Sequence, residues 1–359
     1  MNQAILQRED TATSNDSFET KRTPRSRPRV VSFYLYCFAA LASLQFLRSY
    51  FVIDSSYLDA LKYESGSERM PYQARILMSW IMRHAGTNRL IARAAGFMGG
   101  QLHSPDIFSI FLVDLFSLAL IAWVVRAFYL KVMPSGRLAW LPYLFVLWMM
   151  AQTYIVRFQE AIYFPYDLLA AALFTLCVYL CFARKYLLLV PVFFLACLNR
   201  ETIILVAPLV LLNIETLPRI SRRQWREPAV AIALVCIWAL IYRHLNHLYV
   251  HNPSESFSRI HANLTVLRNP MQWSQIVSGC GFLLGVPFLF WRKMPSVRLR
   301  LYSLVIPVWI AIIFCVGLLG ESRVFGELIG FLAVYCTVLF ESAYVTRKSH
   351  CSEELLLAD

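Results

Sequence analysis

Ten apolar stretches, separated by polar connections, run through this chain of 359 residues. Hydrophobic residues make up 58% of the sequence and charged residues only 16%, whereas soluble domains contain about 45–50% and about 25%. Because a helix needs about 20 apolar residues to cross the bilayer hydrocarbon, we predict an all-α, polytopic integral membrane protein with about ten transmembrane helices. The stretches are 30–51, 106–126, 138–154, 162–182, 186–198, 202–216, 228–246, 275–291, 299–319 and 324–345.

Two of these stretches, 186–198 and 202–216, are short for a full crossing. They form either two complete spans or a hairpin that turns within the outer leaflet. Outside the spans, we expect a disordered basic tail over 1–28 and a short tail over 349–359. Residues 29–348 then form a single transmembrane domain.

The basic residues between the stretches test this arrangement, because cytoplasmic connections are enriched in Lys and Arg. With ten spans, every basic cluster falls on the same side of the membrane, which places both termini in the cytoplasm. The net charge of +12 therefore indicates contact with anionic membrane lipids, and its dispersal among apolar spans argues against nucleic acid binding. The clusters lie at 21–29, 126–137, 184–185, 219–226, 292–300 and 347–348.

The first outer loop, 52–105, is long, and its part 72–98 has a helical pattern that Gly86 interrupts. Apolar residues share one face of this segment, so we expect one or two amphipathic helices on the outer membrane surface. The alternative is a short extra span, which would invert every later connection and spoil the match of the basic clusters.

Ionisable residues next to the apolar stretches gather in the outer turns, where they are costly unless they face a cavity or a partner. Arginines in these turns could converge and bind phosphate oxygens, with a carboxylate such as Asp54 as general base. The alternative is structural pairing, of Arg200 with Glu201 and of Arg323 with Glu327. Neighbours in sequence point away from each other on a helix, which favours partners elsewhere. The candidate residues in the outer loops and turns are Asp54, Asp59, Arg75, Arg157, Glu160, Asp167, Asn199, Arg200, Glu201, Glu321 and Arg323.

No spacing typical of a metal site is present, and most of the nine cysteines lie inside apolar runs as small hydrophobes. The chain also lacks a nucleophile elbow, a phosphate-binding glycine loop and an HExxH motif. We therefore predict no metal ligands and no bound cofactor, and a need for a divalent metal stays open. The sequence does not define the oligomeric state.

The organisation of most of the chain resembles the GT-C class of membrane glycosyltransferases. It is also similar to bacterial membrane proteins that carry a ProTyrGln-x-Arg-x-Leu segment after the first span, an AsnArgGluThr turn and a late GluxArg turn. Here these motifs are Pro71–Leu77, Asn199–Thr202 and Glu321–Arg323. The first-loop acids of this chain are dispersed, whereas GT-C enzymes often show a tight acidic pair.

The resemblance implies a sugar transfer from a polyprenyl-phosphate donor outside the cytoplasm, in a bacterial plasma (inner) membrane. It implies Asp54 or Asp59 as catalytic base and Arg200 or Arg323 as the contact to the lipid phosphate. Two other functions stay open. One is a transporter or flippase for an anionic solute or lipid, and the other is a non-catalytic component of a glycan assembly.

Overall fold

The computed structural model of this chain describes residues 29–53, 55–134, 136–156, 162–213, 225–255 and 258–356. Internal contacts divide the chain into two units, Met1–Phe38 and Ala39–Asp359. In the smaller unit, only residues 29–38 at the start of helix α1 are described. Asp54, Arg157 and Glu160, three of the candidate residues, lie outside the described residues.

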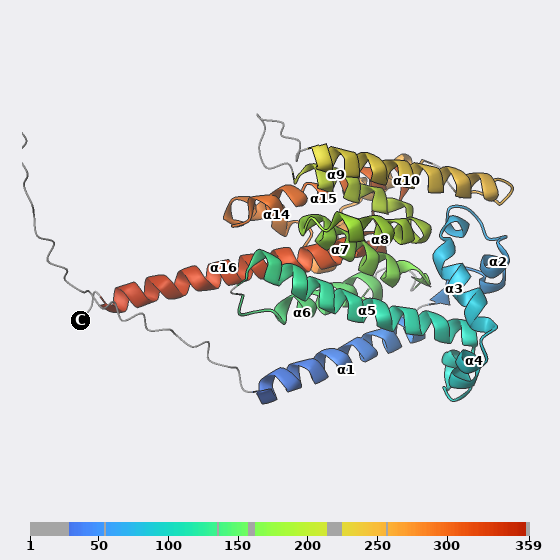
Figure 1. Ribbon diagram of the computed structural model, residues 1–359, viewed down its shortest axis with the longest axis horizontal. Helices are drawn as coiled ribbons and strands as arrows, with labels where there is room; N and C mark the ends of the chain where they lie inside the picture. The colour runs from blue at the N-terminus through green and yellow to red at the C-terminus, as the bar shows by residue number, and fades with distance from the viewer. Residues whose placement is uncertain are drawn as a thin grey trace, which may run out of the picture. The chain divides into compact units, whose positions relative to one another are not determined.

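The regular secondary structure of the described residues is helical apart from one pair of short parallel strands and one isolated bridge, so the predicted all-α class is confirmed (Figure 1). The strands β1 (Ser55–Ser56) and β2 (Ile162–Tyr163) join the first loop to the segment before α7. The α-helices are α1 Arg29–Ile53, α2 Ala60–Ser65, α3 Ile76–Gly86, α4 Arg89–Gly96, α5 Pro105–Val132, α6 Leu141–Met150, α7 Asp167–Phe182, α8 Tyr186–Asn199, α9 Val206–Leu211, α10 Arg226–Leu248, α11 Ile260–Arg268, α12 Trp273–Ser278, α13 Val286–Leu289, α14 Val297–Tyr302, α15 Val305–Val316 and α16 Ile329–Leu356. The tighter or wider turns are η1 Tyr72–Ala74, η2 Gly100–His103, the π-helix η3 Ala151–Ile155, η4 Glu201–Leu205, η6 Pro270–Gln272, η7 Gly279–Phe282, η8 Trp291–Lys293 and η9 Ser322–Leu328.

Four helical stretches among the described residues are long and apolar enough to cross a membrane. They are Pro105–Val132, Arg226–Leu248, Val297–Val316 and Ser322–Tyr344, and they indicate a membrane protein. Shorter apolar helices cover Leu141–Ile155, Asp167–Phe182, Tyr186–Asn199 and Glu201–Leu211. Helix α8 has 14 residues, about 21 Å at 1.5 Å per residue, which is less than the roughly 30 Å of bilayer hydrocarbon.

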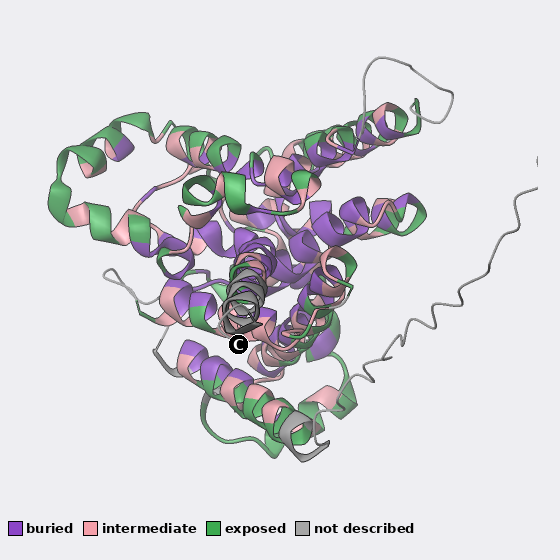
Figure 2. Ribbon diagram, turned by 90° about the vertical axis from the view of Figure 1, so that its left-hand side faces the viewer, coloured by how far each residue is buried: buried purple, intermediate pink, exposed green. Residues whose placement is uncertain are grey.

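Helix α7 lies in the core of the larger unit. All of its residues except Leu176 are buried, as expected for a helix that is apolar on every side. It packs against α5, α8, α9, η9 and α16. Figure 2 shows the buried residues gathered on the inner helices. Because α7 begins at Asp167, the carboxylate of Asp167 lies in the interior.

The stretch 275–291 was expected to form one span, but it is broken into α12, η7 and α13. The break lies at the Ser-Gly-Cys-Gly-Phe segment, Ser278–Phe282, in which Cys280, Gly281 and Phe282 adopt φ of 55°, 62° and 67°. A Cβ on Gly281 would lie 2.7 Å from the indole nitrogen of Trp148. The left-handed backbone and this close approach replace the continuous helix that the apolar pattern predicts.

The first loop forms helices where the sequence predicts them, with the break between Gly86 and Asn88. Helix α3 packs against α5 and α8. Its 11 residues span about 16 Å, too short for the extra crossing considered as an alternative. In α4 and just after it, Leu90 and Phe97 are 73% and 92% exposed.

Candidate functional site

Three turns that are far apart in sequence bring their charged residues together in the larger unit. Arg75 lies between η1 and α3, Arg200 lies between α8 and η4, and Arg323 lies in η9. Asp167, at the start of α7, contacts two of these arginines. The predicted convergence of arginines is thus present for Arg200 and Arg323, whereas Arg157 lies outside the described residues.

The side chain of Arg75 is held by two elements. Its Nη2 and Nε donate to the two carboxylate oxygens of Glu201 at 2.8 and 3.3 Å, and its Nη1 donates to the Tyr166 hydroxyl at 2.7 Å. Burial lowers the pKa of Arg75, but the charge and hydrogen bond of Glu201, together with Tyr166 and the charge of Asp167, raise it by more and hold this pKa well above its ordinary value. The guanidinium therefore stays charged at the cavity wall.

Arg200 is held by carboxylates from α7 and η9. Its Nε lies 2.9 Å from Oε1 of Glu327, and its Nη1 lies 3.4 Å from Oδ1 of Asp167. The Thr202 hydroxyl lies 2.8 and 2.9 Å from the two oxygens of Glu327 and donates to this carboxylate. Glu327 is thus fixed from two sides.

Arg323 is the third arginine of the group. Its Nη2 lies 2.9 Å from Oε2 of Glu321, and its Nη1 lies 3.6 Å from Oδ2 of Asp167. Its guanidinium carbon stacks 3.8 Å from the centre of the Phe164 ring. Asp167 therefore bridges Arg200 and Arg323 through its two oxygens. The side chain of Asn199 donates to the backbone oxygen of Tyr166 at 3.2 Å.

The sequence left open whether Arg200 and Arg323 pair with Glu201 and Glu327 or have partners elsewhere, and these contacts answer that question. Arg200 does not pair with its neighbour Glu201, because the extended backbone of Arg200 (φ −160°, ψ 137°) sends successive side chains to opposite sides. Arg323 pairs with Glu321 rather than with Glu327. The expectation that Arg200 and Glu201 have partners elsewhere is confirmed.

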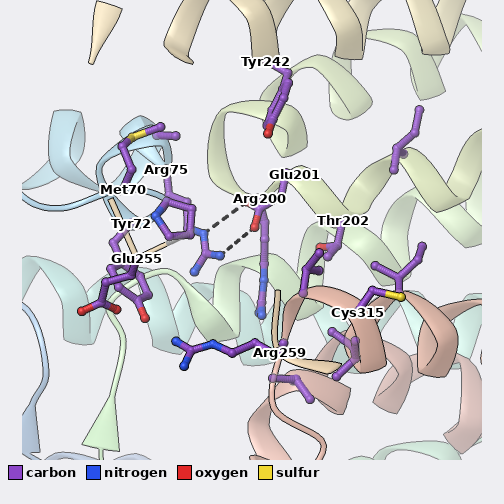
Figure 3. Close-up of a pocket in the computed structure, with 18 of the residues that line it drawn as sticks. Met70, Tyr72, Arg75, Arg200, Glu201, Thr202, Tyr242, Glu255, Arg259 and Cys315 are labelled. Atoms are coloured by element: carbon purple, nitrogen blue, oxygen red, sulfur yellow. Dashed lines mark hydrogen bonds and ion pairs between the residues drawn. The ribbon is translucent and has the colours of Figure 1, made fainter. Parts of the chain in front are cut away.

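A cavity of about 710 Å³ opens beside these residues (Figure 3). One part of its wall is polar and includes Tyr72, Arg75, Arg200, Glu201, Thr202, Glu255, Arg259, Glu321 and Arg323. The other part comes from α8, η4, α10, α15 and their ends and includes Cys197, Ile204, Leu205, Trp238, Ile241, Leu245, Ile312, Ile313, Cys315 and Val316. The cavity therefore has a polar part and an apolar part, as a site for an amphiphilic ligand would.

Glu255 lines the cavity together with Met70, Pro71 and Tyr72 of the first loop. Arg69 pairs with Glu255 at 2.6 Å and stacks 4.2 Å from the Tyr57 ring centre. The backbone N–H of Glu255 donates to the Met70 oxygen at 2.9 Å. Burial raises the pKa of Tyr72 to about 12, so this hydroxyl of the cavity wall stays neutral and can donate a hydrogen bond.

Sequence reasoning missed Glu255 and Arg259, which line the cavity, and Trp238, whose indole N–H donates to the backbone oxygen of Glu201 at 2.8 Å. A usable signal existed for Arg259, because an arginine in a loop predicted to lie outside runs against the expected distribution of basic residues. No comparable signal marked Trp238, which reads as one more apolar residue of a span.

Asp59 has a different place from the arginine group. Its carboxylate accepts from the backbone N–H groups of Leu61 and Lys62 and caps helix α2. It is not part of the cavity wall. Its assignment as a catalytic base stays a prediction, and the structure gives this side chain a helix-capping role.

Among the described residues, no group of His, Cys, Asp or Glu has an arrangement that could hold a metal ion. The polar wall instead offers guanidinium donors next to carboxylate acceptors. No family model, curated protein or solved structure matches this chain. The chemistry of the cavity is therefore the basis for assigning a function.

Proposed function

We propose that this chain is a polytopic membrane glycosyltransferase with about ten spans. In this proposal, the cavity binds a lipid-linked sugar phosphate, and the sugar is transferred to an acceptor at the extracytoplasmic face of a bacterial plasma membrane. The observation that carries the proposal is the cavity itself, in which four arginines adjoin an apolar wall. Guanidinium groups suit phosphate oxygens, and the apolar wall suits the start of a prenyl chain.

The direction of the helices supports the outer location. Helix α8 begins just after Arg184 and Lys185, and α10 begins at Arg226; each reaches the cavity at or near its other end. The α14–α15 pair follows the same course, from Arg298 to Val316. The cavity and the basic connections thus lie at opposite ends of the same helices. Because basic connections mark the cytoplasmic side, the cavity belongs outside.

The exposed helix α4 supports the expected surface helices. Leu90 and Phe97 have no cover among the described residues of the larger unit, and Arg89 and Arg93 lie on the same short helix. Apolar and basic residues on one short helix suit the headgroup region of a bilayer. The start of α5 nine residues later places α4 near this region.

In the proposed reaction, the acceptor hydroxyl oxygen attacks the anomeric carbon of the donor sugar. The bond from that carbon to the phosphate oxygen breaks, and the lipid phosphate leaves with the electron pair. Arg75, Arg200, Arg259 and Arg323 stabilise its negative charge. The acceptor proton passes to a carboxylate, for which Asp54 remains our candidate because Glu201, Glu255 and Glu321 are already paired with arginines.

The proposal is tested by incubating the purified protein in lipid nanodiscs with radiolabelled polyprenyl-phosphate sugars and an acceptor extract. We expect transfer by the natural protein, loss of transfer with retained donor binding in Asp54→Asn, and loss of donor binding in Arg259→Gln. Arg268→Gln is the matched control, because Arg268 is an exposed arginine of the same segment that does not line the cavity.

The same experiment separates the competing functions. Donor binding without any covalent product, together with movement of the lipid across sealed vesicles, would contradict the enzyme and favour a flippase. Normal transfer by Arg259→Gln would show that Arg259 and the cavity take no part in the reaction. An absence of both binding and transfer would favour a non-catalytic component.

A further inference from the structure

The turn η9, which carries Arg323, rests on two other irregular segments of the larger unit. These segments are the π-helix η3 and the turn η7, and each of the three contacts the other two. Their backbones depart from the regular hydrogen bonding of an α-helix, and buried backbone groups that lose a helical partner need one from elsewhere. The side chains that bond to these three segments therefore help to fix the path of η9 at the cavity.

Thr153 of η3 joins both other segments. Its hydroxyl accepts from the backbone N–H of Cys280 in η7 at 3.2 Å, and its backbone oxygen accepts from the Ser322 hydroxyl in η9 at 2.7 Å. Both Thr153 and Ser322 are buried. The last carbonyl groups of a helix lack partners within it, and Ser322 supplies a partner for one of these groups.

Further buried donors hold η7 and η9 together. The Cys280 thiol donates to the backbone oxygen of Phe325 at 3.3 Å, and the indole N–H of Trp309 donates to the backbone oxygen of Val324 at 3.0 Å. The Phe325 ring also approaches Gly279 closely, because a Cβ at Gly279 would lie 2.7 Å from a carbon of that ring. The position of η9 therefore depends on specific contacts with the interior.

Ser322 lies between two charged residues of the cavity wall. Glu321 and Arg323 both line the cavity and pair at 2.9 Å, whereas Ser322 is not among the residues that line it. Arg323 also lies 3.6 Å from Asp167, which is longer than the roughly 2.7–2.9 Å of a strong charged hydrogen bond. A small movement of η9 would therefore change the contacts of the Arg323 guanidinium.

We propose that Ser322 is a positioning residue of the cavity, which sets the direction of Arg323 through its hydrogen bond to the Thr153 backbone oxygen. Ser322 does not contact the ligand. Loss of its hydroxyl leaves a buried carbonyl without this donor, a cost that movement of η9 can relieve. The guanidinium of Arg323 then spends less time in its place at the cavity wall. The consequence for ligand binding rests on the proposed function.

The position of Arg323 can be tested without a ligand by its reaction with phenylglyoxal, which modifies accessible guanidinium groups. The proteins in nanodiscs are labelled over a series of times, and the modified peptides are quantified by mass spectrometry. The Arg323 side chain is only 12% exposed, so it should react slowly in the natural protein. We expect labelling about three- to tenfold faster in Ser322→Ala, the factor that corresponds to one net hydrogen bond.

Ser303→Ala is the matched control. Ser303 is also buried, and its hydroxyl donates to the backbone oxygen of Arg300 at 2.6 Å, but it does not line the cavity. Both variants lose a buried hydroxyl, so we expect similar falls in the thermal unfolding midpoint and faster Arg323 labelling in Ser322→Ala alone. Equally fast labelling in both variants, or an unchanged or slower rate in Ser322→Ala, would overturn the inference.

The affinity for geranylgeranyl phosphate, measured in the same nanodiscs, separates this inference from the proposed function. We expect Ser322→Ala to weaken binding by about three- to tenfold and Ser303→Ala to leave it unchanged. An absence of binding by the natural protein would contradict the proposed function, and the labelling rates would still decide whether Ser322 positions Arg323. Binding that is equally strong in the natural protein and in Ser322→Ala would overturn the role of Ser322 in ligand binding and leave the proposed function in place.

Discussion

Asp167 is the residue through which two of the three turns meet. Its two carboxylate oxygens face Arg200 and Arg323, and the residue is 1% exposed. Without this carboxylate, the positive charges of two buried guanidinium groups would lie near each other with less negative charge to balance them. A buried charge that loses its partner costs several kcal/mol, about 3–5 in typical cases. Asp167 therefore stabilises the arrangement on which any ligand contact depends.

The hydroxyl of Thr202 gives a prediction with a matched control. Thr202→Val removes the donor that Glu327 receives at 2.8 Å and keeps the shape of the side chain. We expect this change to destabilise the fold by about 1.5–3 kcal/mol, as for hydrogen bonds to charged groups. Thr265→Val removes an exposed hydroxyl that donates to the backbone oxygen of His261 and should change stability by less than about 0.5 kcal/mol.

Thermal unfolding in detergent, followed by size-exclusion chromatography of heated samples, measures both variants. A midpoint for Thr202→Val equal to that of Thr265→Val would show that the Glu327 contact contributes nothing to stability.

Part of this residue-level picture could be predicted from the sequence. The charged turns were visible as ionisable residues between apolar stretches, and their adjacency argued against the local pair of Arg200 and Glu201. Their actual partners could not be predicted, because Arg75 and Glu201 are 126 positions apart. Only the packing of α3 against α8 brings them together.

At the scale of elements, the segment from α12 to α13 shows where an apolar pattern is insufficient. Its hydrophobic residues fit a span, but Gly281 and its neighbours Cys280 and Phe282 adopt a left-handed turn, in which Gly281 lies next to Trp148. Apolar periodicity records which residues avoid water. It does not record the backbone conformation that a glycine permits. The helices α5, α7, α8 and α10 have no such interruption, and their positions follow the predicted stretches closely.

Gly281→Ala tests this explanation. The new Cβ would meet the Trp148 nitrogen at 2.7 Å, at a backbone φ of +62°. We expect a loss of at least about 1 kcal/mol of stability from the backbone alone. Gly285→Ala is the control, because nothing lies within 4 Å of its Cβ position. Equal unfolding midpoints for the two variants would contradict the explanation.

Helix α4 gives a second prediction at this scale. If it lies in the outer headgroup region, a fluorophore attached to a cysteine in place of the 92% exposed Phe97 will be quenched by brominated lipids. A fluorophore in place of Lys62, which is exposed in α2, serves as the comparison. Stronger quenching at position 62 than at position 97 would contradict the interfacial location.

At the scale of the whole chain, the strongest sequence signal is the distribution of basic residues, which predicts sides of the membrane but no tertiary contacts. It assigns the charged turns to one side, and the helix directions in the larger unit agree with a common location for them. The cavity could not be predicted, because its apolar wall combines α10 and α15, which are distant in sequence. Glu255 and Arg259 join it through a loop without a sequence motif.

The proposed orientation predicts the labelling of single cysteines in intact cells. A membrane-impermeant maleimide should reach a cysteine at position 268 and miss one at position 293 unless the membrane is opened. Both natural residues, Arg268 and Lys293, are exposed, so burial does not explain a difference. Labelling of position 293 alone would invert the proposed orientation and place the cavity on the cytoplasmic side.

The central claim is that the cavity binds a lipid-linked phosphate, and photo-crosslinking tests it most directly. A polyprenyl phosphate with a photoreactive group in its first prenyl unit is bound to the protein in nanodiscs, illuminated, and mapped by mass spectrometry of peptides. We predict crosslinks to Ile241, Ile312 or Val316 of the apolar wall, with weaker labelling in Arg259→Gln. Crosslinks confined to the outer surfaces of α5 or α16, and unchanged in Arg259→Gln, would contradict the claim.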